Sequence, residues 1–317
     1  MKIAIVGAGA MGCLYGSRLS TTNHEIWLLD IMEDHIKTIQ RQGLTVVEKN
    51  KDGIDETKVY KHLKATTKPE EIGQVDLAII FVKSTITDMA VSGNKPIFGP
   101  NTLILTLQNG LGNVEAIAHI GGLTNVIAGT TAHGASMMQS GEIRHSGTGK
   151  TMIGELSGES TERILTISDI FNSAELETEV SNNVVGLIWD KLLVNVGINA
   201  LTAITGLKNG KLIENPEIEE LLELSVLEAE KVAKAKGVSL NFSNPIEHTK
   251  QVCKATADNS SSMLQDVLNR RKTEIEQING AIVKEGILLG VDTPVNLVLK
   301  NLVKAKEANY ENLQQST

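Results

Sequence analysis

The sequence is poor in aromatic residues and in positive charge, and these shortages argue against nucleic acid as a partner. Phe, Trp and Tyr make up 3% of the 317 residues, and 38 Asp and Glu outnumber 30 Lys and Arg, for a formal charge of −8. Such a chain lacks both the basic surface and the stacking platforms that nucleic-acid binding uses. We therefore expect no nucleic-acid partner.

Cysteine and long apolar runs are scarce as well. Cys13 and Cys253 are the only cysteines, so the sequence contains neither a disulfide framework nor a cysteine-rich metal site. No run reaches the roughly 18 to 20 uninterrupted apolar residues of a membrane helix. Glycines interrupt the first apolar stretch after four residues, too early for a signal peptide. We expect a cytoplasmic protein with no membrane partner and no metal.

The length and the hydrophobic pattern predict two domains. Single cores stop growing at roughly 250 to 300 residues, so this chain is long enough for two of them. Residues 1–182 contain short β-branched runs separated by helical segments, which predicts an α/β, Rossmann-type dinucleotide-binding domain. Residues 183–317 contain helical patterns throughout, which predicts an all-α C-terminal domain that carries substrate and catalytic residues.

A glycine-rich turn follows the first expected strand. Residues 2–6 form an apolar strand, residues 7–12 read GAGAMG, and residues 13–19 have a helical pattern. In this G-x-G-x-x-G arrangement the glycines allow a tight bend, the approach of a pyrophosphate and close packing of helix on strand, in that order. Phosphates would bind the N–H groups at the helix start. The expected cofactor contacts here are Gly7, Gly9, Ala10, Met11 and Gly12.

The second expected strand, residues 25–29, ends at Asp30. An acidic side chain at this position accepts hydrogen bonds from both hydroxyls of the adenosine ribose and repels a 2′-phosphate. Asp30 therefore favours NAD(H) over NADP(H). The alternative is that Asp30 only caps the helix that begins near Glu33, since Asp is common at helix N-caps.

Two polar residues follow later strands. Lys83 comes directly after the strand of residues 76–82, and Asn109 follows the strand of residues 103–107. Ligands of open parallel sheets bind beyond the carboxyl ends of the strands, so both are candidates for cofactor contact. The alternatives are a solvated charge for Lys83 and a plain turn residue for Asn109.

Residues 126–154 alternate small and polar residues with glycines, which predicts short antiparallel strands that complete the sheet. His133 and His145 lie within this segment. No third ligand stands at metal-like spacing, so we interpret both histidines as structural.

An apolar helix, expected over about residues 183–207, carries polar residues at four-residue spacing. Lys191, Asn195 and Asn199 therefore share one stripe. Burying them without partners costs on the order of several kcal/mol, so the stripe is expected to face a cleft or a ligand. Desolvation would lower the pKa of Lys191 and suit it to general acid catalysis. The alternative is a buried network in which Lys191 pairs with a carboxylate such as Glu274.

Further helices are expected in the C-terminal half. An Asn-Pro pair starts one over residues 216–236, before a terminating glycine. A last long helix is expected from residue 262, with Ser262 and Gln265 as a capping box and an apolar stripe that continues to Ile282. A straight helix places Ser262 and Glu274 about 120° apart. Spacing alone therefore does not bring these two residues into one site.

These residues resemble the ketopantoate reductase (2-dehydropantoate 2-reductase) family over almost the whole chain. The motifs that carry the resemblance are GAGAMG at 7–12, VK at 82–83, QNG at 108–110, GTTAHGA at 129–135, SGEIRHSGTG at 140–149, WDKLLVNVGINALTA at 189–203 and SSMLQDVLNRRKTEIEQING at 261–280. The family reduces ketopantoate to pantoate on the route to pantothenate and coenzyme A. The resemblance implies a Rossmann domain, an all-helical domain and an active site between them.

The resemblance also implies roles for individual residues. Lys191 corresponds to the family's general acid, and Glu274 to the catalytic-site carboxylate that holds the substrate hydroxyl. Ser262 corresponds to the residue that binds the substrate carboxylate. The remaining contacts that it implies, to substrate, nicotinamide or cofactor, come from Asn109, Asn195, Asn199 and Lys83.

Three positions depart from the family's pattern. The family usually uses NADP(H), commonly with a basic residue where this chain has Asp30. The residue itself favours NAD(H), and the resemblance keeps NADP(H) open. Ile86 replaces the family's Gln, and Ala132 replaces the Thr before the histidine, so both bear on the nicotinamide pocket.

The expected reaction is hydride transfer from a reduced nicotinamide to the C2 carbonyl of a 2-oxo acid, with Lys191 protonating the alkoxide. One alternative is a reductase of other branched 2-oxo acids. The polar residues of the motifs do not distinguish such an enzyme from a ketopantoate reductase. Another is a non-catalytic NAD(H)-sensing regulatory protein, which has little use for the Lys191 stripe or Glu274. The apolar helices could support a homodimer, but the sequence contains no interface pattern.

Overall fold

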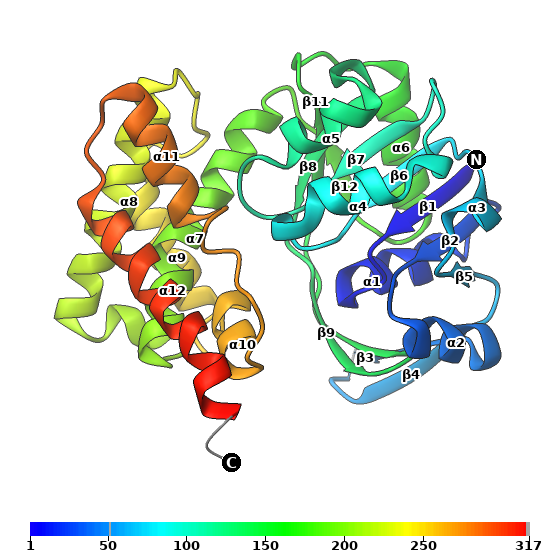
Figure 1. The fold of residues 1–317 in the computed structure, drawn as a ribbon, viewed down its shortest axis with the longest axis horizontal. Helices are drawn as coiled ribbons and strands as arrows, with labels where there is room; N and C mark the ends of the chain where they lie inside the picture. Colours follow the sequence, from blue (N-terminus) through cyan, green and yellow to red (C-terminus); the bar gives the residue numbers. More distant parts are fainter. Residues whose placement is uncertain (51, 315–317) are drawn as a thin grey trace. The chain divides into compact units, whose positions relative to one another are not determined.

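The computed structural model describes residues 1–50 and 52–314, and the chain divides into two compact units (Figure 1). The first unit is Met1–Gln108 with Asn113–Val184, and the second is Asn109–Gly112 with Val185–Thr317. The sequence predicts a boundary at residue 182, and the last residue of the first unit is Val184. The division also assigns the short loop that contains Asn109 to the second unit, which the sequence did not indicate.

The first unit is built on an eight-stranded sheet with the strand order β12-β11-β8-β7-β6-β1-β2-β5. Neighbouring strands are parallel, except that β11 runs antiparallel to β8. The strands are β1 (Lys2–Val6), β2 (Glu25–Leu29), β5 (Lys64–Thr66), β6 (Leu77–Ile80), β7 (Leu103–Thr106), β8 (Val126–Thr131), β11 (Thr151–Glu155) and β12 (Thr178–Val180). The expected Rossmann-type sheet is confirmed.

Helices connect these strands and bury both faces of the sheet. They are α1 (Ala10–Leu19), α2 (Glu33–Gln42), α3 (Pro69–Ile72), α4 (Thr87–Gly93), α5 (Asn113–Gly121) and α6 (Glu162–Ser173), with the 3₁₀ turns η1 (Ser84–Ile86), η2 (Lys95–Ile97) and η3 (Leu123–Asn125). In β1, Ile3 and Ile5 pack into the cluster that contains α1, α2 and α6, whereas Ala4 and Val6 pack into the cluster that contains α3, α4 and α5. This alternation explains the continuous apolar strands, which are typical of parallel sheets.

A second sheet of four strands, in the order β4-β3-β10-β9, lies in the same unit. Its strands are β3 (Leu44–Lys49), β4 (Asp55–Tyr60), β9 (Gly134–Gln139) and β10 (Glu142–Gly147). The expectation that residues 126–154 complete the main sheet with antiparallel strands is therefore wrong in part. β8 and β11 join the main sheet, but β10 pairs in parallel with β3. Local periodicity cannot predict a pairing between strands so far apart in the sequence.

The second unit is all helical, as expected. It contains α7 (Val184–Thr205), η4 (Asn209–Ile213), α8 (Pro216–Ala235), α9 (Pro245–Ala255), α10 (Ser262–Leu268), α11 (Asn279–Leu289) and α12 (Pro294–Gln314). Among the described residues, α7 is the one helix long and apolar enough to cross a membrane, with a mean hydropathy of 1.5 over its most apolar window, although its apolar residues do not form an uninterrupted run. In the structure 67% of that window is buried, and α7 contributes the largest share of the unit's core.

The long last helix expected from residue 262 is not continuous, which corrects the sequence analysis. α10 ends at Leu268, and regular helix resumes only at Asn279. Arg270 adopts φ +51°, a left-handed conformation that an α-helix does not contain. Leu268 and Arg271 follow Leu264 at four- and three-residue steps, which would place them on the expected stripe of that helix, but both are exposed. The 120° separation of Ser262 and Glu274 on a straight helix therefore does not apply.

Candidate functional site

The glycine turn between β1 and α1 has the local geometry that a bound dinucleotide requires. Gly7 adopts φ +99°, and a Cβ there would lie 2.7 Å from the Val82 backbone nitrogen. A Cβ at Gly12 would overlap the carbonyl oxygen of Gly7, so only glycine lets α1 approach the turn. No described residue lies within 4 Å of a Cβ built at Gly9. The turn therefore fits a pyrophosphate placed against the N-terminal N–H groups of α1.

Asp30 contacts this turn directly. Its Oδ2 accepts a hydrogen bond from the Ala8 N–H at 2.7 Å, and its Oδ1 accepts one from the Met32 N–H at 3.0 Å. The N-cap of α2 is Met32, so the alternative that Asp30 caps this helix is wrong. A carboxylate offers about four acceptor sites, and two of them remain for ribose hydroxyls. The same side chain thus stabilises the turn and can bind a ribose.

Lys83 lies where β6 ends, at the start of the η1 turn, and is half-buried. A polar network joins the ends of β6 and β7 next to it. Gln108 Nε2 donates to the Val82 carbonyl at 2.7 Å and to Thr87 Oγ1 at 2.8 Å, and Thr87 Oγ1 donates to Asn113 Oδ1 at 2.8 Å. These bonds hold the strand ends near Lys83 in a defined arrangement.

The polar stripe of the second unit lies on α7, as the spacing predicts. Lys191 is half-buried, and removal from water lowers its pKa to about 8, an effect that the negative charge of Glu274 opposes. Asn199 is 4% exposed, and its Nδ2 has no hydrogen-bond partner among the described residues. Since buried amide donors are normally paired, Asn199 indicates a place for a ligand or water acceptor. Asn195 lies between them on the stripe and is half-buried.

The loop that contains Asn109 belongs to the same unit as this stripe, and it packs against Gln277, three residues after Glu274 in the sequence. Gly110 adopts φ +80°, and a Cβ there would lie 2.6 Å from the Gln277 carbonyl oxygen. Close approach to the segment after Glu274 therefore requires glycine at this position. The tertiary structure thus places Asn109, Glu274 and Lys191 in one unit, although they come from three remote segments of the chain.

The start of α10 differs from the expectation in one residue. Ser261 is the N-cap, and its hydroxyl accepts a hydrogen bond from the Leu264 N–H at 3.0 Å. The expected capping box on Ser262 is therefore wrong by one position. The Ser261 hydroxyl also lies 2.6 Å from Thr202 Oγ1 on α7, about one turn beyond Asn199. Ser262 is the first residue of the helix and is exposed, which leaves its hydroxyl accessible to a ligand.

Several side chains of this unit have buried polar atoms that the sequence did not predict, and Asn209 and Gln277 are two of them. Asn209 is 7% exposed, and its Oδ1 has no hydrogen-bond partner within the described part of the chain. Its N–H donates to the Asn259 carbonyl at 3.0 Å, and its Nδ2 donates to Thr256 Oγ1 at 2.9 Å. The buried Oε1 of Gln277 is likewise unpartnered. Neither residue follows a periodic pattern, so only burial distinguishes them from ordinary loop residues.

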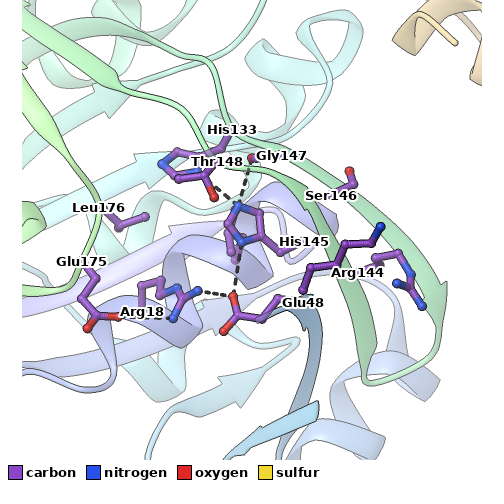
Figure 2. A pocket seen from close by; sticks show the side chains of 12 residues that line it. Arg18, Glu48, His133, Arg144, His145, Ser146, Gly147, Thr148, Glu175 and Leu176 are labelled. Carbon is purple, nitrogen blue, oxygen red and sulfur yellow. Dashed lines mark hydrogen bonds and ion pairs between the residues drawn. The ribbon is translucent and has the colours of Figure 1, made fainter. Parts of the chain in front are cut away.

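His133 and His145 line a separate cavity of about 410 Å³ in the first unit (Figure 2). His133 Nδ1 lies 3.3 Å from His145 Nε2, and His145 Nδ1 lies 3.4 Å from Glu48 Oε2, which also pairs with Arg18. Burial, together with the neighbouring His145, lowers the pKa of His133 to about 4. The network joins α1 to the four-stranded sheet, which agrees with a structural interpretation of both histidines.

Comparison with known proteins gives matches over nearly the whole chain. Family models described as "Ketopantoate reductase PanE/ApbA" and "Ketopantoate reductase PanE/ApbA C terminal" match residues 3–158 and 183–307. The 2-dehydropantoate 2-reductase of Halobacterium salinarum is 36% identical over 305 residues, covering 96% of this chain and 98% of the relative. That of Pyrococcus horikoshii is 37% identical over 308 residues, covering 97% and 98%.

Solved structures agree with these matches. The PanE/ApbA family ketopantoate reductase from Ralstonia eutropha has a TM-score of 0.89 at 33% identity, covering 98% of this chain and 100% of that chain. D-mandelate dehydrogenase, solved with NADH and anilino(oxo)acetate, has a TM-score of 0.90 at 29% identity with the same coverage. The glycine turn, the helical second unit with its Lys191 stripe, and these full-length matches show that the chain belongs to the ketopantoate reductase (2-dehydropantoate 2-reductase) family.

Proposed function

We propose that the chain reduces 2-dehydropantoate (ketopantoate) to pantoate with a reduced nicotinamide cofactor, a step in the synthesis of pantothenate and coenzyme A. The observation that carries this proposal is Lys191, an amine whose pKa burial lowers to about 8 and which shares a helix face with two asparagines. Strongly shifted amines of this kind are typical of catalytic sites. A protein that only senses NAD(H) has no use for one.

The glycine turn would hold the cofactor. The N–H groups of Gly9, Ala10 and Met11 would bind the pyrophosphate, and Lys83 would add a positive charge near it. When bound, the reduced nicotinamide supplies a hydride to the carbonyl carbon of the 2-oxo acid. Asp30 would accept hydrogen bonds from the ribose hydroxyls and repel a 2′-phosphate, so we propose NADH as the preferred cofactor and NADPH as the weaker one. The related D-mandelate dehydrogenase was solved with NADH.

Lys191 would act as the general acid. As negative charge develops on the carbonyl oxygen, its ammonium donates a proton to that oxygen, and solvent then reprotonates the amine. A pKa of about 8 keeps Lys191 protonated at neutral pH and makes it a better donor than an ordinary lysine. Glu274 favours the protonated form through its negative charge, and its carboxylate would accept a hydrogen bond from the product hydroxyl.

The other polar residues of the second unit would position the substrate. The Ser262 hydroxyl would bind the substrate carboxylate, and the amides of Asn109, Asn195 and Asn199 would orient substrate and nicotinamide. The unpartnered Nδ2 of Asn199 supports this role, because a ligand oxygen would satisfy it. Fixing the carbonyl group in this way contributes to the rate by orientation.

The direct test is the loss of NADH absorbance when ketopantoate is added to the purified protein. We expect turnover with ketopantoate and a higher kcat/KM for it than for other branched 2-oxo acids. The likeness to D-mandelate dehydrogenase makes a reductase of another 2-oxo acid the second candidate. A panel in which a different 2-oxo acid has the highest kcat/KM would favour that candidate, and turnover with none of them would favour an NAD(H) sensor.

We also propose a cytoplasmic location and only small-molecule ligands for the catalytic role. Cys13 and Cys253 are free, buried thiols, which suits a reducing compartment. Exposed apolar residues of α11 and α12, such as Ile287 and Val298, could support a homodimer. Measuring the molar mass in solution by light scattering tests that last point.

A further inference from the structure

His35, on α2, is a buried histidine whose ring nitrogens have separate partners. The residue is 0% exposed. Its Nδ1 accepts a hydrogen bond from the backbone N–H of Gly141 at 2.9 Å, so the proton of the neutral ring is on Nε2. Burial lowers the pKa of His35, which keeps the ring neutral at physiological pH. The Nε2–H group lies 3.4 Å from the sulfur of Cys13 and donates to it.

Cys13, in the first turn of α1, continues this chain of contacts. Its thiol donates to the carbonyl oxygen of Ala8 at 3.1 Å. Burial raises the pKa of the Cys13 thiol, so the sulfur keeps its proton and remains a donor. A continuous series of hydrogen bonds therefore runs from the Gly141 N–H through His35 and Cys13 to Ala8, in the middle of the glycine turn.

These contacts fix the orientation of one peptide unit in that turn. The Ala8 carbonyl and the Gly9 N–H belong to the same peptide, and in a trans peptide they point in opposite directions. Holding the Ala8 oxygen toward Cys13 therefore directs the Gly9 N–H to the opposite side. The preceding peptide is held as well, because the Ala8 N–H donates to Asp30. Both peptides that flank Ala8 are thus fixed by side chains.

The four-stranded sheet provides the anchor for this arrangement. Gly141, in the turn between β9 and β10, adopts φ +76°, and a Cβ there would lie 2.5 Å from the Thr38 Cγ2 on α2. Its carbonyl accepts a hydrogen bond from the Thr45 N–H at 2.9 Å. The turn is therefore packed closely against α2 and offers His35 a rigid donor. None of the expected site residues lies on these four strands. Through the Gly141 N–H, however, the sheet fixes the orientation of the His35 ring.

We propose that His35 and Cys13 are positioning residues for the dinucleotide, which hold the Ala8–Gly9 peptide so that the Gly9 N–H faces the pyrophosphate. The proposal deepens the proposed function and rests on it. Neither side chain touches the reacting atoms. Loss of either should therefore weaken dinucleotide binding and leave the chemical step unchanged once the cofactor is saturating.

The test is the Kd for NADH, with NADPH as a second probe, measured by fluorescence titration of the whole protein without substrate. His35→Phe removes both ring nitrogens at similar size, and we expect Kd to rise about 5- to 10-fold. Cys13→Ala removes the thiol donor alone and should raise Kd about 2- to 5-fold. His35→Gln can place an amide donor where Nε2 lies, so it should recover part of the loss. We expect kcat at saturating cofactor to stay within about twofold of the wild type.

A matched control separates positioning from general destabilisation. Glu155 on β11 is 4% exposed and bonds Arg163 at 2.7 and 2.6 Å, and three strands separate β11 from β1 in the sheet. Glu155→Gln should lower the Tm and leave Kd for NADH unchanged. If His35→Phe and Cys13→Ala lower the Tm but not the affinity, the positioning role is wrong. If the wild-type protein binds neither dinucleotide, the proposed function fails, and this inference fails with it.

Discussion

The candidate sites of the two units consist of different chemical groups, backbone N–H groups in the first unit and side chains in the second. In the first unit the glycine turn offers backbone N–H groups, and the residues that matter are those that lack a side chain, such as Gly9 and Gly12. In the second unit the candidate site consists of side chains, among them Lys191 and Asn199 on α7. A backbone site depends on local conformation, which a short motif encodes. A side-chain site depends on which segments pack together, which a short motif does not encode.

The largest effect should come from removing the amine of the second unit. We expect Lys191→Ala to lower kcat about 10²- to 10⁴-fold, because the alkoxide loses its proton donor, and to change the Kd for NADH little. Steady-state rates with ketopantoate and a separate NADH titration check this. Asn195→Ala on the same helix face is the matched control, with a smaller expected loss in kcat. Near-normal turnover of Lys191→Ala would rule out its assignment as general acid.

The corresponding change in the first unit is Gly12→Ala. Its Cβ would overlap the Gly7 carbonyl oxygen, so the turn must shift. We expect dinucleotide affinity to fall on the order of 100-fold, because steric changes of this kind cost about 2 to 3 kcal/mol. Gly9→Ala meets no described atom within 4 Å and serves as the control for folding, measured by Tm. An unchanged NADH Kd in Gly12→Ala would contradict the proposed position of the pyrophosphate.

The pH dependence of the reaction should report on Lys191 in the second unit. Burial lowers the pKa of Lys191 from 10.5 to about 8, and the general acid must be protonated to act. The rate of reduction should therefore be constant below this pKa and fall as pH rises through about 8, reaching roughly a tenfold loss one pH unit above it. The profile of kcat against pH measures this. A rate that stays flat to the ordinary pKa of lysine would show that Lys191 is not the group that titrates.

The smallest effect should come from Asp30, the side chain of the first unit that we propose selects the cofactor. Asp30→Asn removes the negative charge and keeps an oxygen that can accept from the Ala8 N–H. We expect the ratio of kcat/KM for NADH to that for NADPH to fall about 3- to 10-fold, because the repulsion of the 2′-phosphate is lost. Asp30→Ala also releases the Ala8 N–H and should weaken both dinucleotides. A wild-type preference for NADPH would contradict the role proposed for Asp30.

The sequence predicted the local elements well wherever periodicity and boundary residues agreed. α2 ends at Gln42, directly before Gly43, which adopts φ +87°, and α8 begins after Asn215, whose side chain accepts a hydrogen bond from the Ile218 N–H at 3.2 Å. The long last helix failed because Arg270 leaves the helical region, although the apolar spacing continues past it. Apolar residues at steps of three and four share a face only where the backbone is helical. The residue types around Arg270 do not reveal that the helix ends there.

The sequence by itself determined the Rossmann-type sheet, the glycine turn, the helical second unit and the stripe of Lys191, Asn195 and Asn199, since each depends on residues close together in the chain. Only the tertiary structure decided the second sheet, the place of Asn109 in the second unit and the chain of hydrogen bonds from Gly141 through His35 to the glycine turn. Those features join segments that are remote in sequence. Their geometry depends on how the whole chain packs, which local propensity does not specify.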